Sequence, residues 1–147
     1  MHSRLVVLLA VGIAAGAGCG GGGDGGGGTG PEGPGQVSIR LTVPAGIVDG
    51  IALVQVSGGT VAQVLSRGLQ FRAVGVGGTT VHVMARGTLQ GSLALAAICV
   101  PRVEDLENYT AQLVQVAAGQ AGGYAKRDIT PYVVTLDPAS VTPVANC

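Results

Sequence analysis

Histidine is the residue type most often used for acid–base catalysis, and His82 is the histidine of this chain that lies outside residues 1–18. No G-x-S-x-G motif or other nucleophile setting lies near it, although a fold could bring Ser57 or Ser66 to it, because catalytic triads are recognised by geometry and not by sequence position. His82 alternates with apolar neighbours, and we therefore expect a solvent-facing or hydrogen-bonded strand residue. A small secreted hydrolase or other enzyme using His82 is the alternative hypothesis, and no catalytic residue is predicted.

Glu104, Asp105 and Glu107 form the acidic cluster of the chain. Carboxylate oxygens suit calcium, but these residues lack the D-x-[DN]-x-[DN]-G order of a dedicated calcium loop. If Pro101 to Asn108 forms one or two helical turns, its apolar residues face inward and its acids face solvent. A solvated turn explains the cluster, so we predict no metal and no cofactor.

The charge balance argues against a nucleic-acid partner. The chain has 8 Lys and Arg residues and 8 Asp and Glu residues, a net charge of zero at pH 7. Nucleic-acid-binding proteins show a basic stripe and usually a high isoelectric point. The adjacent basic pair Lys126-Arg127 lies beside Asp128, and we expect it to cap the loop between the last two strands.

The N-terminal residues have the pattern of an export signal. A start containing Arg4 is followed by the apolar run Leu5 to Ala15 and by small residues up to Cys19. A basic segment, an apolar segment and a small-residue cleavage site are typical of secretory signal peptides. With cysteine at the cleavage point, the stretch resembles the signal and lipobox of bacterial lipoproteins. The resemblance implies that residues 1–18 are a signal peptide and that Cys19 carries the lipid, a fatty-acyl anchor such as palmitate.

Two other interpretations of the N-terminus remain open. Gly16 stands where lipoproteins usually carry leucine, and the stretch from Ala15 to Ala17 is an A-x-A site at which ordinary signal peptidase could cut. That cut would release a secreted or periplasmic protein. An uncleaved anchor is disfavoured, because Leu5 to Gly18 is shorter than the ~20 apolar residues that a spanning helix needs.

Lipid attachment at Cys19 has a consequence for Cys99 and Cys147, the other two cysteines. An odd number of cysteines in an exported protein leaves one unpaired. If Cys19 carries the lipid, the other two can form a disulfide in an oxidising compartment, which would stabilise the domain by roughly 4 kcal/mol in the chain-entropy model. The alternative is a buried free thiol at Cys99, which lies in the apolar run Leu93 to Val100.

Residues 20–35 are predicted to be a flexible tether between Cys19 and the folded domain. Eleven of these sixteen residues are glycine, so the segment cannot bury enough apolar surface to offset its ordering entropy. As a coil it would span on the order of 20–25 Å. Its G-x-G-x-x-G matches follow a signal peptide and precede prolines, so we exclude a phosphate-binding loop.

Residues 36–136 form one domain by length, and their hydrophobicity alternates with a period of two. Turn signals such as Asp49-Gly50 and Gly77-Gly78 separate the segments. The fold class is therefore predicted as an all-β antiparallel sandwich of seven to eight strands, immunoglobulin-like or jelly-roll, with a tail at 137–147. The expected strands are Val37–Val43, Ile51–Val56 (covered on both faces), Val61–Leu65 (an edge strand), Leu69–Ala73, Thr80–Ala85, Gly91–Val100, Tyr109–Leu113 and Tyr132–Leu136.

The core should be aliphatic, because the chain has one phenylalanine and no tryptophan. Tyrosines are expected to bury their rings at strand ends and to hydrogen-bond through their hydroxyls. Gly91 to Val100 followed by Tyr109 to Val114 is similar to the penultimate strands of cohesin-like extracellular sandwiches. That resemblance implies a module that docks a partner, and it designates no docking residues here.

These observations favour a membrane-anchored lipoprotein of the cell envelope with a non-catalytic β-sandwich. Its role would be structural or the binding of a protein or glycan partner. Gly20 follows the lipidated cysteine where an inner-membrane retention signal would have aspartate, so the resemblance to bacterial lipoproteins favours the outer membrane.

Overall fold

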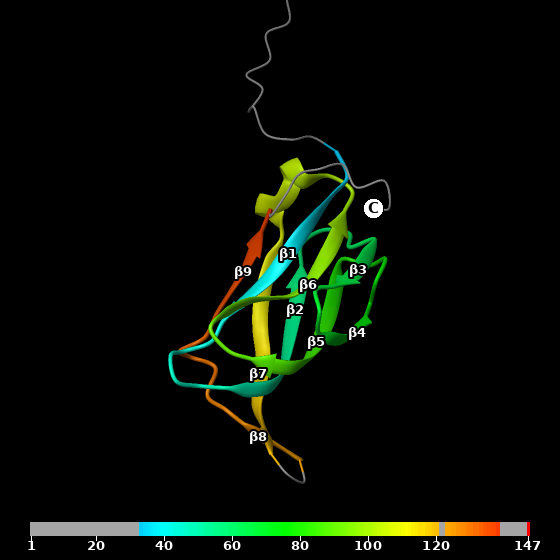
Figure 1. The fold of residues 1–147 in the computed structure, drawn as a ribbon. Helices are drawn as coiled ribbons and strands as arrows, with labels where there is room; N and C mark the ends of the chain where they lie inside the picture. Colours follow the sequence, from blue (N-terminus) through cyan, green and yellow to red (C-terminus); the bar gives the residue numbers. More distant parts are fainter. Residues whose placement is uncertain (1–32, 121–122, 139–146) are drawn as a thin grey trace, which may run out of the picture.

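Alternating apolar residues fold this chain into two antiparallel sheets packed face to face (Figure 1). The computed structural model describes residues 33–120, 123–138 and 147. One sheet has four strands, in the order β3 (Gln63–Ser66), β6 (Ser92–Val100), β1 (Gly35–Thr42) and β9 (Val133–Asp137). The other has five strands, in the order β4 (Gln70–Val74), β5 (Thr80–Leu89), β2 (Asp49–Ser57), β7 (Thr110–Gln120) and β8 (Gly123–Lys126). The all-β sandwich is confirmed.

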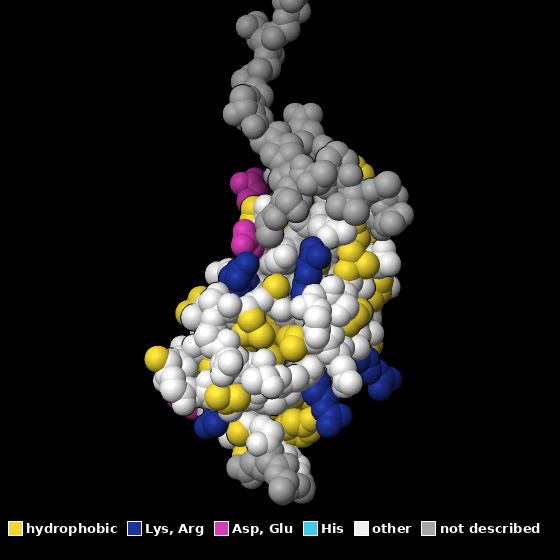
Figure 2. Space-filling model, in the orientation of Figure 1, with side chains coloured by type: hydrophobic (Ala, Val, Ile, Leu, Met, Phe, Trp, Pro, Cys, Tyr) yellow, Lys and Arg dark blue, Asp and Glu magenta, His cyan; other side chains and the backbone are white. Residues whose placement is uncertain are grey.

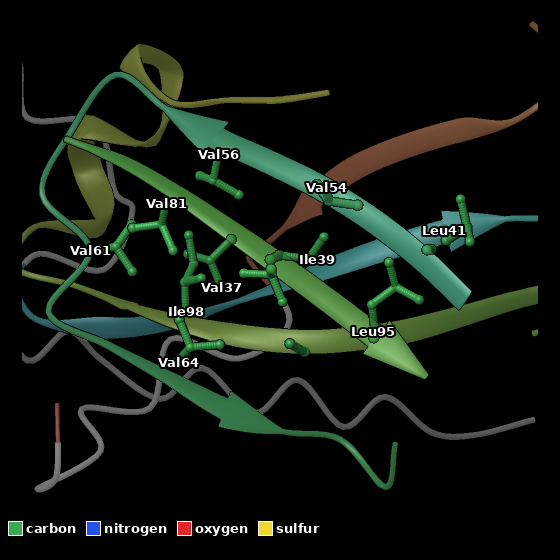
Figure 3. Close-up of a cluster of buried hydrophobic side chains, with 14 of the residues drawn as sticks. Val37, Ile39, Leu41, Val54, Val56, Val61, Val64, Val81, Leu95 and Ile98 are labelled. Carbon is green, nitrogen blue, oxygen red and sulfur yellow. The ribbon is translucent and has the colours of Figure 1, made fainter. Parts of the chain in front are cut away.

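The inward faces of the two sheets form one aliphatic core. Val37, Ile39 and Leu41 of β1 point toward Val54 and Val56 of β2, and all five have no exposed surface (Figure 3). Successive side chains of a strand point to opposite faces, so the apolar residues of β1 share the core face. On the other face Gln36 and Arg40 are half-exposed and Ser38 is buried. Burial of each Val or Leu side chain contributes about 1.5–3 kcal/mol, and these contributions hold the sheets together.

Some details of the strands differ from the sequence expectations. The segment 51–56 is not covered on both faces, because Ala52, Val54 and Val56 are buried while the residues between them are half-exposed. Asp49-Gly50 lies inside β2 and not in a turn. The structure has nine strands where seven to eight were expected, and β8 is the strand that the pattern did not predict. The predicted tail begins inside β9, which extends to Asp137.

The pairing of β1 with β6 shifts register between Ile39 and Arg40. At that irregularity Leu95 and Ala96 are consecutive in the chain and both are fully buried. A bulge of this kind breaks the strict alternation of a strand. It explains why the run from Ala94 to Ala97 does not show a period of two.

The 3-10 helix η1 (Val103–Asn108) closes the end of the sandwich at which β1 begins (Figure 1). Val103 is buried and Leu106 packs against the core, as the sequence predicted for this segment. The backbone of Gly33 is held there twice: its carbonyl accepts a bond from the Val103 N–H at 2.9 Å, and its N–H donates to Glu104 Oε2 at 2.9 Å. The chain therefore enters the domain at a fixed point beside η1.

No helix within the described part of the chain is both long and apolar enough to cross a membrane. The expected signal peptide, Cys19 and almost all of the expected tether lie outside the described residues.

Candidate functional site

His82 lies on the outer face of β5, half-buried between Val74 of β4 and Gln55 of β2. Ser57 is on the same face but shares a 3.0 Å hydrogen bond with the Thr110 hydroxyl. Ser66 belongs to the other sheet and donates to the Leu69 carbonyl at 3.0 Å. Neither serine is hydrogen-bonded to His82, so the contacts that would favour the hydrolase hypothesis are not found among the described residues.

The acidic cluster anchors the start of the domain. Glu104 accepts the Gly33 N–H and pairs with Arg102 Nε at 2.9 Å, while Asp105 lies 3.4 Å from the same nitrogen. The backbone hydrogen bond from Gly33, together with Arg102, lowers the pKa of Glu104 to about 2. Within the described residues, no group of three or more acidic, histidine or cysteine side chains is arranged to hold a metal ion.

Cys99 and Cys147 are joined as a disulfide, with Cα atoms 5.2 Å apart. This pairing agrees with the sequence prediction. Cys99 is buried, as in the alternative, but its sulfur is in a disulfide and not a free thiol. Cys99 pairs across the ladder with Gln36 and Gln63, and both of these side chains belong to the outer face of the four-stranded sheet. The last residue of the chain is thereby attached to that sheet near the end where β1 begins.

A buried polar network joins β2 to the loop between β8 and β9. The Asp49 side chain has no exposed surface and accepts hydrogen bonds from Arg127 Nε and from the Tyr132 hydroxyl, the latter at 2.7 Å. Burial and the bond to Asp49 raise the pKa of Tyr132 to about 12. The sequence suggested that Arg127 caps this loop. In the structure Arg127 also neutralises a buried carboxylate.

The tyrosines behave as expected at two of three positions. Tyr109 and Tyr132 are each 8% exposed, and the Tyr109 hydroxyl donates to the Thr60 carbonyl at 2.9 Å. Tyr124 of β8 is different, since it is 44% exposed and its ring lies 5.7 Å from the guanidinium carbon of Arg86. The ring lies beside Gly50, where an added Cβ would come within 3.2 Å of it.

The outer face of the five-stranded sheet carries an unbalanced positive charge. Its outward residues include Arg72 on β4, Arg86 on β5 and Lys126 on β8, together with the half-buried His82. The five strands contain one carboxylate, Asp49, and that group is buried and paired with Arg127. We call this surface the cationic sheet face and define it by Arg72, Arg86, Lys126, His82, Gln55, Gln70, Gln112 and Gln115.

Two shallow hollows flank Arg86 on this face, at the β4–β5 edge. One is lined by Gln70, Phe71, Arg72, Met84 and Arg86. The other is lined by Gly68, Leu69, Gln70, Arg86, Gly87 and Thr88. Phe71, the single phenylalanine of the chain, is 37% exposed and borders the first hollow, but its position opposite the buried Ala85 puts its side chain on the other face of the sheet from Arg72.

Acidic groups lie away from this face. Glu104, Asp105 and Glu107 belong to η1, and the acidic side chains visible in Figure 2 gather mainly at that end of the sandwich. Asp137 pairs with Arg40 at 3.5 Å on the four-stranded sheet. Asp128 accepts two hydrogen bonds from Thr130 in the β8–β9 loop. The described exposed carboxylates thus lie outside the cationic sheet face, where other cations such as Arg40 and Arg102 pair with them.

Sequence reasoning did not find the cationic sheet face. Arg72 and Arg86 lie far apart in the chain and each alternates with apolar residues, as any solvated strand residue does. Only the register that sets Gln70 opposite Arg86 and Arg72 opposite Met84 brings them together. Comparisons with protein-family models, curated proteins and solved structures found no match to this chain.

Proposed function

We propose that this protein is a lipid-anchored lipoprotein of the bacterial cell envelope whose β-sandwich binds a partner and catalyses no reaction. Support for the anchor comes from the signal-like N-terminus, the cysteine at its end and the glycine-rich tether. Because Cys99 and Cys147 pair with each other, neither needs Cys19 for a disulfide, which supports its assignment to the lipid. By resemblance to bacterial lipoproteins, the outer membrane is the favoured location.

One observation supports the binding role above all: the cationic sheet face has three exposed cations and no exposed carboxylate. Its outward apolar residues also stay exposed, with Val74 at 60% and Val114 at 46%. An exposed apolar and charged surface of this kind marks an interaction site in a soluble domain. The two hydrogen bonds of Gly33 beside η1 fix the point at which the predicted tether would leave the domain. An anchored domain would therefore present the cationic sheet face at its side.

Binding to isolated cell envelopes tests this function without knowledge of the ligand. The full-length chain carrying Cys19→Ala, which has no site for the lipid, should sediment with envelopes through its sheet face alone. Adding Arg72→Gln and Arg86→Gln should abolish that sedimentation, because both guanidiniums border the same hollow.

Arg40→Gln is the matched control, since it removes the same charge from the four-stranded sheet. It should leave sedimentation unchanged. If the double variant and the Arg40→Gln variant sediment like the unsubstituted chain, the sheet face is not the binding surface and a purely structural role becomes the better account.

A further inference from the structure

We infer that the cationic sheet face binds an acidic polysaccharide, with Arg72 and Arg86 receiving its carboxylates. The inference rests on the proposed binding function and adds the chemical class of the ligand.

The two arginines supply the charge recognition. Arg72 and Arg86 both border the hollow that also contains Gln70. A guanidinium binds a carboxylate through two parallel N–H bonds, which a lysine ammonium cannot do. Tyr124 lies 5.7 Å from the Arg86 guanidinium, and this contact restrains Arg86 before any ligand arrives. Arg72 forms no salt bridge with any of the described residues.

The floor of the same hollow supplies a second kind of recognition. Met84 is 36% exposed there and lies opposite Arg72 on the same face as the two arginines. Gln70 offers an amide that both donates and accepts hydrogen bonds, as sugar hydroxyls do. A sugar acid presents an apolar ring face, hydroxyls and a carboxylate together, and it can use all three features. An acidic peptide side chain or a lipid phosphate would use the charge alone.

The extent of the face indicates a polymer. Arg72 lies on β4 at one edge of the sheet and Lys126 on β8 at the other. Neighbouring strands lie about 4.8 Å apart, so four spacings separate these edges by roughly 19 Å. Between them lie the amides of Gln55 and Gln115, on β2 and β7. A single sugar cannot reach across this distance, whereas a linear polysaccharide can contact both edges.

Affinity electrophoresis of the full-length protein through gels containing polygalacturonate tests the inference, with dextran as the neutral polymer. Polygalacturonate should retard the protein and dextran should not. The Arg72→Gln/Arg86→Gln variant should bind polygalacturonate at least about tenfold more weakly, since each arginine loses a charge-assisted bond. Arg40→Gln should bind like wild type.

Met84→Ala separates a sugar ligand from other anions. It should weaken polygalacturonate binding several-fold and leave any residual binding of poly-glutamate unchanged, while Met84→Leu should retain most of the sugar binding. Circular dichroism melting of each variant checks that the domain is folded.

Three results would overturn the inference. Poly-glutamate or phosphatidylglycerol vesicles bound more tightly than polygalacturonate would identify an acidic peptide or a membrane as the ligand. Equal weakening by Arg40→Gln would mean that the attraction is not localised to this face. Sedimentation with envelopes through the face, without any retardation by polygalacturonate, would refute the polysaccharide and leave the proposed binding function standing.

Discussion

Asp49 is the one charged side chain that the described part of the sandwich buries, and it is satisfied by two partners. Burying a carboxylate costs several kcal/mol unless hydrogen bonds and an opposite charge offset it. Arg127 provides the charge and Tyr132 provides a hydroxyl from the far side of the loop. The network therefore fixes where the β8–β9 loop meets β2.

Asp49→Ala should destabilise the domain by about 2–4 kcal/mol, because it leaves the Tyr132 hydroxyl and Arg127 without their acceptor. The cost stays below the largest values for buried pairs, since the Arg127 side chain is 38% exposed and can be rehydrated. Urea denaturation measures the difference. Asp128→Ala is the control, because Asp128 is exposed and bonds only Thr130, and its cost should be under about 1 kcal/mol. Equal losses of unfolding free energy in the two variants would show that the buried network stabilises the domain no more than the exposed Asp128 does.

Tyr132 predicts a loss of stability in alkali. Its pKa is about 12 in the folded domain against 10.0 for an ordinary tyrosine. A group with a raised pKa in the folded state contributes stability that is fully present below its unfolded pKa. That contribution is lost as the pH rises from about 10 through about 12. Denaturation midpoints should fall over this range in the wild type and fall less in Tyr132→Phe. An identical decline in both proteins would exclude Tyr132 as the cause.

The buried network of Asp49 and the arginines of the cationic sheet face were the hardest features to predict from the sequence. Asp49 looked like half of a turn signal, because Asp-Gly pairs are common in turns. Its burial depends on Arg127 and Tyr132, which lie 78 and 83 residues away in the chain. Likewise, Arg72 and Arg86 acquire a common role only through the register of β4 with β5. Long-range pairings of this kind leave no local pattern.

At the scale of elements, the alternating strands were predictable, and the short strand β8 was not. The alternation of Val37, Ile39 and Leu41 directly records one buried face, and β1 forms where expected. β8 has only four residues, Gly123–Lys126, too few to show a period. The ring of Tyr124 in β8 reaches across β7 and lies beside Gly50 of β2. That contact is between residues far apart in the sequence.

The hydrogen bond from the Gly33 N–H to Glu104, which we call the η1 clamp, predicts a loss of stability in acid. The pKa of Glu104 is about 2 in the folded domain against 4.5 ordinarily, chiefly because Gly33 donates a backbone hydrogen bond to the carboxylate. A lowered pKa contributes stability that is present above about pH 4.5 and lost as the pH falls through about 2.

Glu104→Gln should therefore destabilise the domain at neutral pH, and the difference from wild type should disappear as the pH falls toward 2. Chemical denaturation across this range provides the comparison, and Glu107→Gln, for which no such clamp contact is found, is the control. A difference that persists unchanged in acid would mean that the clamp does not depend on the Glu104 charge.

At the scale of the whole molecule, the start of the described domain and Cys147 are fixed near one another. Gly33 is held beside η1, and Cys147 is bonded to Cys99, which lies opposite Gln36 near the start of β1. The opposite end, with β8, is free of both (Figure 1). An anchored domain of this design presents its sheet faces laterally and its β8 end away from the attachment point.

The disulfide closes a loop of 48 residues, so its removal should cost about 2–4 kcal/mol. Cys147→Ser, or a reductant, should lower the urea midpoint accordingly. Cys19→Ser should leave it unchanged, because the sequence predicts that Cys19 precedes the folded domain. Thiol titration of the denatured, unreduced protein gives an independent check: free thiol at Cys99 in the wild type would contradict the pairing.

The central claim is that Cys19 attaches this sandwich to a membrane, and the intact mass of the mature protein extracted from membranes tests it most directly. The account predicts a chain that begins at Cys19 and carries the added mass of its acyl groups, and it predicts that Cys19→Ala yields no acylated form. An unmodified chain beginning at Gly18 and recovered in the soluble fraction would contradict the claim.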